Sequence, residues 1–257
     1  LKNALTKEHK RYGEVGIIKD GKRIQINTSI IQIENEYYSS IRPKRVTPPG
    51  ERPINILRDE GIDYVEIRAL DNNSFLPTGI DEDTSYFLEA YLIGCFFGED
   101  KKSSQDEIKE LLVNWENVVK EGRNPALKLL KNGKKISLKE AGLEIIDSLR
   151  NIFAQMPEAM SGYVNKVFKS LDRQEKKFLD SSLTPSGDII NRLENNKTWE
   201  ELNLELSKNH ARILRDKDFD LGYLRKEAKE SLDKFEKLEE INEIEFEEYL
   251  DKFIKDI

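Results

Sequence analysis

The sequence predicts an α+β protein in which a short strand-rich part precedes a longer helical part. Before residue 80, apolar residues alternate with polar ones in two segments, the period-2 pattern of half-buried strands. After residue 81, apolar residues recur at helical spacing, and capping motifs mark helix starts. We therefore divide the 257-residue chain into residues 1–80 and residues 81–257, and we expect both parts to belong to one fragment of a longer chain.

The first predicted strand spans residues 23–35 (RIQINTSIIQIEN), where isoleucines alternate with polar residues. An Asp20-Gly21 pair precedes it and predicts a tight turn. Residues 41–53 contain four prolines, so we expect a loop without regular structure there.

The second predicted strand spans residues 62–70 (IDYVEIRAL). Its alternation places Glu66 and Arg68 on the same side, about 7 Å apart along the strand. A carboxylate can bind Mg²⁺, and a guanidinium can hold a phosphate by paired hydrogen bonds. The pair therefore suits phosphoryl transfer, and the alternative is a salt bridge on a solvated strand face.

Acidic residues at Asp81 and beyond predict a helix start, and the helix that follows is apolar nearly all round. We expect it to be buried, together with its Cys95 thiol. A further helix covers residues 108–119, and S-x-x-E-type capping boxes at Ser137 and Thr198 begin two more.

The composition excludes several classes of protein. The net charge of −7 argues against a general nucleic-acid or membrane-surface binder, which needs a basic face. One cysteine excludes a disulfide framework, and two histidines disfavour a histidine-based metal centre or a serine-histidine triad. No secretory signal and no apolar segment long enough to span a membrane is visible, which predicts a cytoplasmic protein.

A basic cluster lies between the two predicted strands. Five bases stand against one acid, Glu51, between residues 42 and 58. The bases are Arg42, Lys44, Arg45, Arg52 and Arg58. The cluster can bind an anion, and the alternative is a solvated loop with no ligand.

Four segments together resemble the bacterial glutamate–cysteine ligases. They are QIENEYYSSIRPKR at residues 32–45, GERP at 50–53, GIDYVEIRALDNNSFLPTGID at 61–81 and NWENVVKEGRNP at 114–125. The segments are long and occur in the family's order. The resemblance is specific from residue 1 to about residue 125 and becomes a general helical likeness afterwards.

The resemblance implies an antiparallel sheet similar to that of glutamine synthetase, with strands between about residues 15 and 75. It implies that ATP and Mg²⁺ activate the γ-carboxylate of glutamate as an acyl phosphate, which the cysteine amine attacks. This reaction is the first step of glutathione biosynthesis. The implied partners are glutamate, cysteine and ATP, with no nucleic acid and no membrane.

The resemblance also implies roles for individual residues. Glu66 stands where the family has a metal-binding glutamate, and Arg68 where it has an arginine facing the transferred phosphate. Tyr38 stands where a tyrosine lines the cysteine pocket. For the nucleotide or phosphate side, the candidates are Asn35, Arg42 and Arg45.

Members of the family are about twice as long as this chain. We therefore expect the chain, which starts at Leu1, to be a C-terminal half that is inactive alone. The absent N-terminal half should hold most of the metal-binding carboxylates. Two alternatives stay open: a related ligase that uses another amine, and a helical binding module that no longer catalyses.

Overall fold

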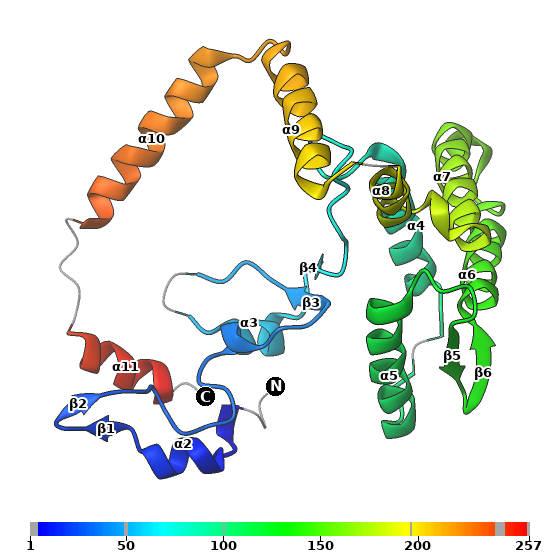
Figure 1. Ribbon diagram of the computed structural model, residues 1–257. Helices are drawn as coiled ribbons and strands as arrows, with labels where there is room; N and C mark the ends of the chain where they lie inside the picture. Colours follow the sequence, from blue (N-terminus) through cyan, green and yellow to red (C-terminus); the bar gives the residue numbers. More distant parts are fainter. Residues whose placement is uncertain (1–4, 49–50, 100, 196, 240–244, 256–257) are drawn as a thin grey trace. The chain divides into compact units, whose positions relative to one another are not determined.

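The computed structural model confirms the α+β class, and helices make up most of it (Figure 1). The residues that it describes are 5–48, 51–99, 101–195, 197–239 and 245–255. The chain forms two compact units: unit 1 comprises Leu1–Asp71 with Phe219–Ile257, and unit 2 comprises Asn72–Asp218. Within the described ranges, we find no helix long and apolar enough to cross a membrane.

Unit 1 is built from short elements in its first part and two helices at its end. They are α2 (Lys10–Val15), β1 (Ile18–Lys19), β2 (Lys22–Arg23), η1 (Glu34–Glu36), β3 (Ile41–Lys44), α3 (Pro53–Glu60), β4 (Tyr64–Ile67), α10 (Leu221–Glu239) and α11 (Phe246–Lys255). β1 and β2 form an antiparallel hairpin, and β3 and β4 are also antiparallel. Asp20 and Gly21 have φ angles of 51° and 74°, which confirms the predicted turn.

The predicted strand over residues 23–35 is wrong beyond its first residue, because β2 ends at Arg23. The polar side chains that alternate with the isoleucines bond to the backbone here. The Ile26 amide donates to Gln32 Oε1 at 2.8 Å, and Asn27 Nδ2 donates to the Gln32 carbonyl at 3.0 Å. Such bonds compete with the hydrogen bonds of a strand ladder, so the segment folds back on itself instead of extending.

The expectation of no regular structure over residues 41–53 is wrong at both ends. β3 contains Pro43, and α3 begins at Pro53. In the described part of the chain β3 pairs with β4 alone, and a strand with an open edge tolerates the missing N–H of proline. At the first position of a helix the N–H has no intrahelical acceptor, so proline also fits there.

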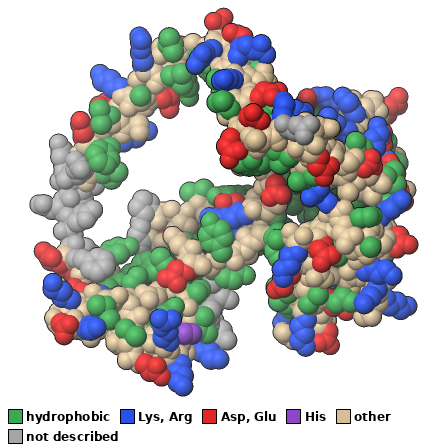
Figure 2. All heavy atoms as spheres, in the orientation of Figure 1, with side chains coloured by type: hydrophobic (Ala, Val, Ile, Leu, Met, Phe, Trp, Pro, Cys, Tyr) green, Lys and Arg blue, Asp and Glu red, His purple; other side chains and the backbone are tan. Residues whose placement is uncertain are grey.

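α10 is one of the two helices that follow unit 2 in the sequence and belong to unit 1. Figure 2 shows hydrophobic side chains at its surface. The exposed ones include Leu221, Leu224, Leu232, Phe235 and Leu238. These apolar side chains of α10 are therefore exposed.

Unit 2 is a helical unit that also holds one β-hairpin. Its elements are α4 (Glu82–Phe96), α5 (Gln105–Glu121), β5 (Lys128–Lys131), β6 (Lys134–Ser137), α6 (Leu138–Phe153), η2 (Glu158–Met160), α7 (Ser161–Leu179), η3 (Ser181–Leu183), α8 (Pro185–Glu194) and α9 (Trp199–Arg215). The helices α4, α6 and α7 pack around the main core. That core consists of Ala90, Ile146, Leu149, Phe153, Val167 and Leu171.

Side-chain caps begin the α-helices of unit 2 other than α7. The Asp81 carboxylate accepts a hydrogen bond from the Thr84 amide at 2.8 Å, at the acidic helix start that the sequence predicts. The predicted capping boxes at Ser137 and Thr198 are both confirmed, and Ser104 forms another at the start of α5. Each cap satisfies backbone N–H groups that the first helical turn leaves without an acceptor.

The expectation that the helix after Asp81 is buried all round is wrong. Ala90 is fully buried, whereas Phe96 is 84% exposed, and Cys95 is exposed as well. α4 packs against α6 and α7, which cover one side of it. The apolar composition of a helix does not show how many neighbours surround it. The expectation of a buried Cys95 is therefore wrong as well.

The packing of α6 against Phe178 gives a stability prediction. A Cβ at Gly142 would stand 2.4 Å from Phe178 Cδ1, and Phe178 packs on the core. We expect Gly142→Ala to lower the free energy of unfolding by about 1–3 kcal/mol. Gly162→Ala is the control, because a Cβ at Gly162 in α7 meets no atom within 4 Å. That change should raise stability by up to about 1 kcal/mol. Urea unfolding measures both, and an equally stable Gly142→Ala variant would contradict the packing.

Candidate functional site

Four of the charged side chains singled out by the sequence lie on one face of the β3–β4 pair. Arg42 stands opposite Glu66, and Lys44 stands opposite Tyr64. Directly opposite residues of an antiparallel pair point to the same side, and so do residues two apart on one strand. We call the residues Arg42, Lys44, Glu66 and Arg68 the strand face.

Glu66 is at the centre of the strand face. Arg68 Nη2 donates a hydrogen bond to Glu66 Oε2 at 3.0 Å, and Lys44 Nζ lies 3.4 Å from the same oxygen. The hydrogen bond from Arg68 lowers the pKa of the Glu66 carboxyl, with a smaller contribution from Lys44. The same bond raises the pKa of the Arg68 guanidinium. Glu66 is therefore ionised at neutral pH.

Tyr38 completes this group of residues. The Arg68 guanidinium carbon lies 4.7 Å from the centre of the Tyr38 ring, a cation–π arrangement. Tyr38 is 79% exposed, so its ring is accessible to a ligand. The fold thus brings together Glu66, Arg68 and Tyr38, the three residues to which the sequence resemblance gives a metal, phosphate and cysteine role.

A cavity of about 290 Å³ lies between β3, α3 and the η1 turn. It is lined by Asn35, Arg42 and Arg45, the three residues expected on the nucleotide or phosphate side. Its apolar lining includes Ile41, Pro43, Pro53, Ile54 and Leu57. The cavity therefore combines an apolar wall for a flat ring with a basic side for an anion, the usual character of a small-molecule site.

Arg45 lines this cavity but already binds two carboxylates. Its Nε donates to Glu60 Oε2 at 2.9 Å, and its Nη1 donates to Asp63 Oδ1 at 2.7 Å. These bonds tie the end of α3 and the start of β4 to β3. Arg58 of the same basic cluster pairs with its neighbour Asp59. Much of the local positive charge is therefore neutralised, and Arg42 and Lys44 are the cluster's cations on the strand face.

A buried ion pair holds the segment that carries Asn35 and leads to Tyr38. Arg52 Nε donates to Glu34 Oε1 at 2.7 Å, and the two side chains are only 1% and 3% exposed. Arg52 Nη1 also donates to the Phe253 carbonyl at 3.1 Å, and its guanidinium lies 4.4 Å from the centre of that ring. One side chain thus joins η1, the start of α3 and α11.

Sequence reasoning placed Lys44 in a basic cluster without giving it a role. The structure shows that it faces Glu66 together with Arg42 and Arg68. The available signal was the i, i+2 spacing of Arg42 and Lys44. It was missed because Pro43 between them disfavoured a strand.

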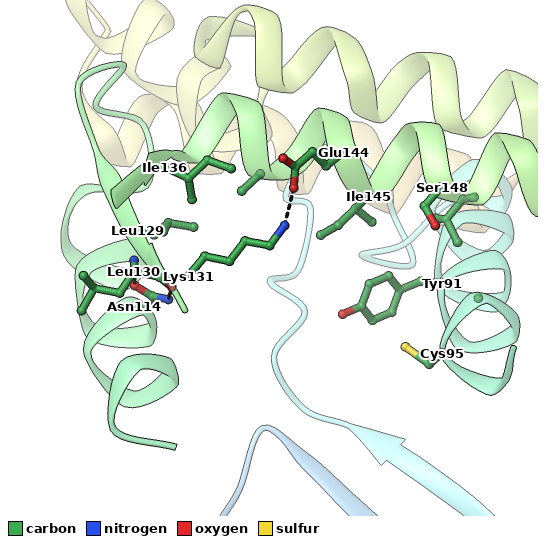
Figure 3. Close-up of a pocket in the computed structure, with 13 residues that line it drawn as sticks. Tyr91, Cys95, Asn114, Leu129, Leu130, Lys131, Ile136, Glu144, Ile145 and Ser148 are labelled. Atoms are coloured by element: carbon green, nitrogen blue, oxygen red, sulfur yellow. Dashed lines mark hydrogen bonds and ion pairs between the residues drawn. The ribbon is translucent and has the colours of Figure 1, made fainter. Parts of the chain in front are cut away.

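A larger cavity, of about 530 Å³, lies in unit 2 (Figure 3). Lys131 and Glu144 form an ion pair at one side of it, and Tyr91 and Cys95 lie at another. Its apolar lining includes Leu129, Ile136, Ala141, Ile145 and Leu149. Its charged residues are paired with each other, and it contains none of the site residues expected from the sequence. The strand face and the smaller cavity are therefore the better candidate site.

The strand face fits a metal ion only in part. Within the described residues there is no group of three or more His, Cys, Asp or Glu side chains that could hold a metal. Mg²⁺ is commonly bound through one or two carboxylates, with phosphates and waters as its other ligands. Glu66 therefore fits as one ligand of Mg²⁺, and a complete site needs oxygen atoms from elsewhere.

Fold and geometry thus define an α+β protein with a mainly basic strand face beside a small cavity. A sequence profile described as glutamate–cysteine ligase matches residues 1–118. The chain is 40% identical to the glutamate–cysteine ligase of Pseudomonas putida over 233 residues, which are 90% of this chain and 44% of that protein. It is 41% identical to the Pseudomonas entomophila enzyme over 233 residues, 90% of this chain and 43% of that protein.

A solved structure of a glutamate–cysteine ligase also matches this chain. The crystal structure of the glutamate–cysteine ligase of Francisella tularensis in complex with AMP matches with a TM-score of 0.86 and 34% identity. The match covers 98% of this chain and 50% of that chain. The chain belongs to the glutamate–cysteine ligase family, which confirms the resemblance seen in the sequence. It spans about half the length of the relatives that it matches.

The buried ion pair predicts a large stability effect at one arginine. Arg52→Met leaves the Glu34 carboxylate buried without its partner, so we expect a loss of about 3–5 kcal/mol in the free energy of unfolding. Arg58→Met is the matched control, because Arg58 pairs with Asp59 on the surface, and it should change stability by less than about 1 kcal/mol. Urea unfolding monitored by circular dichroism separates the two, and equal effects would contradict the role assigned to the buried pair.

The contact between Arg68 and Glu66 predicts a pKa change. Arg68→Met removes the main cause of the lowered pKa of Glu66, so this pKa should rise toward its ordinary value of 4.5. In the wild type, the lowered pKa of Glu66 means that its ionised form stabilises the fold at pH values above 4.5. This stabilisation is lost as the pH falls through the pKa of Glu66 in the folded state. Carboxyl-carbon NMR titration measures the shift. Arg42→Met should leave the Glu66 pKa where it is, and a Glu66 pKa unaffected by Arg68→Met would contradict the assignment.

Proposed function

We propose that this chain supplies part of the active site of an enzyme that uses ATP to join the γ-carboxylate of L-glutamate to the amine of L-cysteine. This is the first step of glutathione biosynthesis. The observation that supports the proposal most directly is that Arg68 contacts both Glu66 on the strand face and the Tyr38 ring, in a chain of the glutamate–cysteine ligase family. Residues 1–80 provide this catalytic part, and residues 81–257 provide the helical region.

In the proposed reaction, the γ-carboxylate of glutamate attacks the γ-phosphorus of ATP, and ADP leaves. The cysteine amine then attacks the acyl carbon of the resulting γ-glutamyl phosphate, a proton is lost from nitrogen, and inorganic phosphate leaves. Negative charge is spread over the phosphoryl oxygens during transfer, so catalysis depends on positioned cations. Arg68 is the proposed catalytic residue, because a guanidinium can bond two phosphate oxygens at once.

Glu66 is the proposed ligand of Mg²⁺. When bound, Mg²⁺ neutralises charge on the ATP phosphates. The lowered pKa of Glu66 supports this role, because a carboxyl group binds a metal ion in its ionised form. Lys44 Nζ lies 3.4 Å from Glu66 Oε2, so its ammonium group would become available to a phosphate oxygen if Glu66 held a metal ion. Lys44 would thereby add positive charge next to Arg68.

The cavity of about 290 Å³ is the proposed place of the nucleotide. Asn35 would bond to the base or ribose there, and Arg42 would bind phosphate. The relative from Francisella tularensis was solved with AMP, which supports a nucleotide as a ligand of the family. Arg45 belongs to the same proposed site, where its bonds to Glu60 and Asp63 let it shape the cavity while adding little free charge.

Tyr38 is the proposed contact for cysteine. Its exposed ring lies against Arg68, so an amine substrate held there would stand next to the transferring phosphoryl group. The same arrangement would serve a related ligase with another amine, because the proposed roles of Glu66 and Arg68 concern the metal ion and the phosphate and not the amine. The choice of amine therefore depends on Tyr38 and on residues beyond this chain.

A further segment should complete the site. The relatives are about twice as long, and the strand face offers one carboxylate where a complete Mg²⁺ site needs more oxygen ligands. We therefore propose that this chain acts as the C-terminal half of a longer ligase and is inactive alone. Its partners would be glutamate, cysteine and ATP, with no nucleic acid or membrane. The cytoplasm, where these substrates occur together, is its proposed location.

The test joins the segment of the Pseudomonas putida relative that lies outside the matched region to the start of this chain. We call the product the joined protein. We expect it to release phosphate from ATP with Mg²⁺ only when glutamate and cysteine are both present. Arg68→Met should lower kcat about 10²–10³-fold, the effect of losing one preorganised charge in a transition state. Glu66→Gln should have an effect of similar size.

Two controls accompany this assay. Arg58→Met removes a surface arginine from the same basic cluster and should keep kcat within about twofold of the joined protein, while all variants stay folded at the assay temperature. The isolated chain should release no phosphate. Normal turnover by Arg68→Met would overturn the proposed mechanism, and turnover with another amine in place of cysteine would overturn the proposed substrate.

A further inference from the structure

One face of α5 in unit 2 carries large apolar side chains that are exposed. The six residues are between 38% and 69% exposed. They are Ile108, Leu111, Leu112, Trp115, Val118 and Val119. At about 100° per residue they fall within a sector of roughly 120°, the width of a core-facing helix stripe. We call them the α5 stripe.

The other sides of α5 have their own partners. Asn114 Nδ2 donates to the Leu130 carbonyl at 2.7 Å, and the Leu130 amide donates to Asn114 Oδ1 at 2.7 Å. The Gly133 amide donates to Glu110 Oε1, also at 2.7 Å. These bonds fix α5 on the β5–β6 hairpin, beside which it lies in Figure 1. The rotation of the helix is therefore set, and the α5 stripe lies on a different side of the helix from Asn114 and Glu110.

Charged residues occupy the remaining side of the helix. Lys109 pairs with Asp106, and Lys120 pairs with Glu116, all of them exposed. Such pairs are typical of a helix side that faces water. The apolar side is different, because a contiguous exposed apolar patch on a protein usually marks a contact surface. The separation of the two sides indicates that the α5 stripe is built to be covered.

We propose that the α5 stripe is the docking surface for the segment by which the relatives are longer than this chain. The chain spans 44% of the Pseudomonas putida relative and 50% of the Francisella tularensis structure, so about half of each relative has no counterpart here. A segment of that length needs an extensive apolar surface to pack on a partner stably. The inference rests on the proposed function in one respect, that the chain works as half of a longer ligase.

The test measures how fast a thiol on α5 reacts with a maleimide. Native cysteines, including Cys95, are replaced by serine, and Leu112→Cys then places one thiol on the α5 stripe. Val113→Cys is the matched control, because Val113 is the next residue, is 45% exposed and lies outside the stripe. In the isolated chain both variants should react rapidly. In the joined protein we expect Leu112→Cys to react at least tenfold more slowly and Val113→Cys to change less than twofold.

Each other result overturns the proposal. Equally fast labelling of both variants in the joined protein would show that the α5 stripe is uncovered. Equal slowing of both would show general protection without a contact at the stripe. Slow labelling of Leu112→Cys in the isolated chain, relieved on dilution, would make a second copy the occupant. Val119→Cys repeats the measurement if Leu112→Cys lowers the helix content.

Ligase activity of the joined protein separates this inference from the proposed function. If the joined protein is active and Leu112→Cys reacts rapidly, the docking proposal is wrong and the proposed function stands. If Leu112→Cys reacts slowly and the joined protein is inactive, the docking proposal stands and the proposed reaction is wrong.

Discussion

The candidate site depends on one buried ion pair, between Glu34 and Arg52. It joins three segments of unit 1, because Arg52 also bonds the Phe253 carbonyl, 201 residues further along the chain. A buried charge without a partner is costly, so each of these groups holds the others in place. The pair fixes the turn that carries Asn35 and leads to Tyr38, and it fixes the start of α3, which forms a wall of the cavity. The geometry of the proposed nucleotide and amine sites therefore depends on the Glu34–Arg52 pair, although this pair is proposed to contact neither ligand.

The strand face has an excess of positive charge in an acidic protein. Arg42, Lys44 and Arg68 surround one carboxylate, Glu66, whereas the whole chain has a net charge of −7. Cations gathered on one face favour an anionic ligand over the field of the remaining surface. Glu66 is the anion that Arg68 and Lys44 bind. A triphosphate with its metal ion can take over both kinds of contact, since it brings negative charge for the bases and a cation for the carboxylate.

Local patterns were predictable from the sequence, and contacts between distant residues were not. The alternation over residues 62–70 predicted a strand with Glu66 and Arg68 on the same side, and both features are present, because alternation is a property of neighbouring residues. Residues 23–35 show the same alternation but form no strand beyond Arg23, since Gln32 bonds the backbone instead. The partner of Arg52 could not be found, because no local rule links it to a glutamate 18 residues away. Family resemblance supplied the grouping of Tyr38 with the charged pair, which spacing alone does not give.

The fate of the glutamate oxygen atoms tests the central claim most directly. If the γ-carboxylate attacks the γ-phosphorus of ATP, the oxygen that forms the new bond leaves with the phosphate when the amine attacks the acyl carbon. Glutamate labelled with ¹⁸O in its γ-carboxylate is given to the joined protein with ATP, Mg²⁺ and cysteine, and the released phosphate is analysed by mass spectrometry. The account predicts one labelled oxygen in phosphate for each peptide bond formed. Phosphate that carries no label would contradict it.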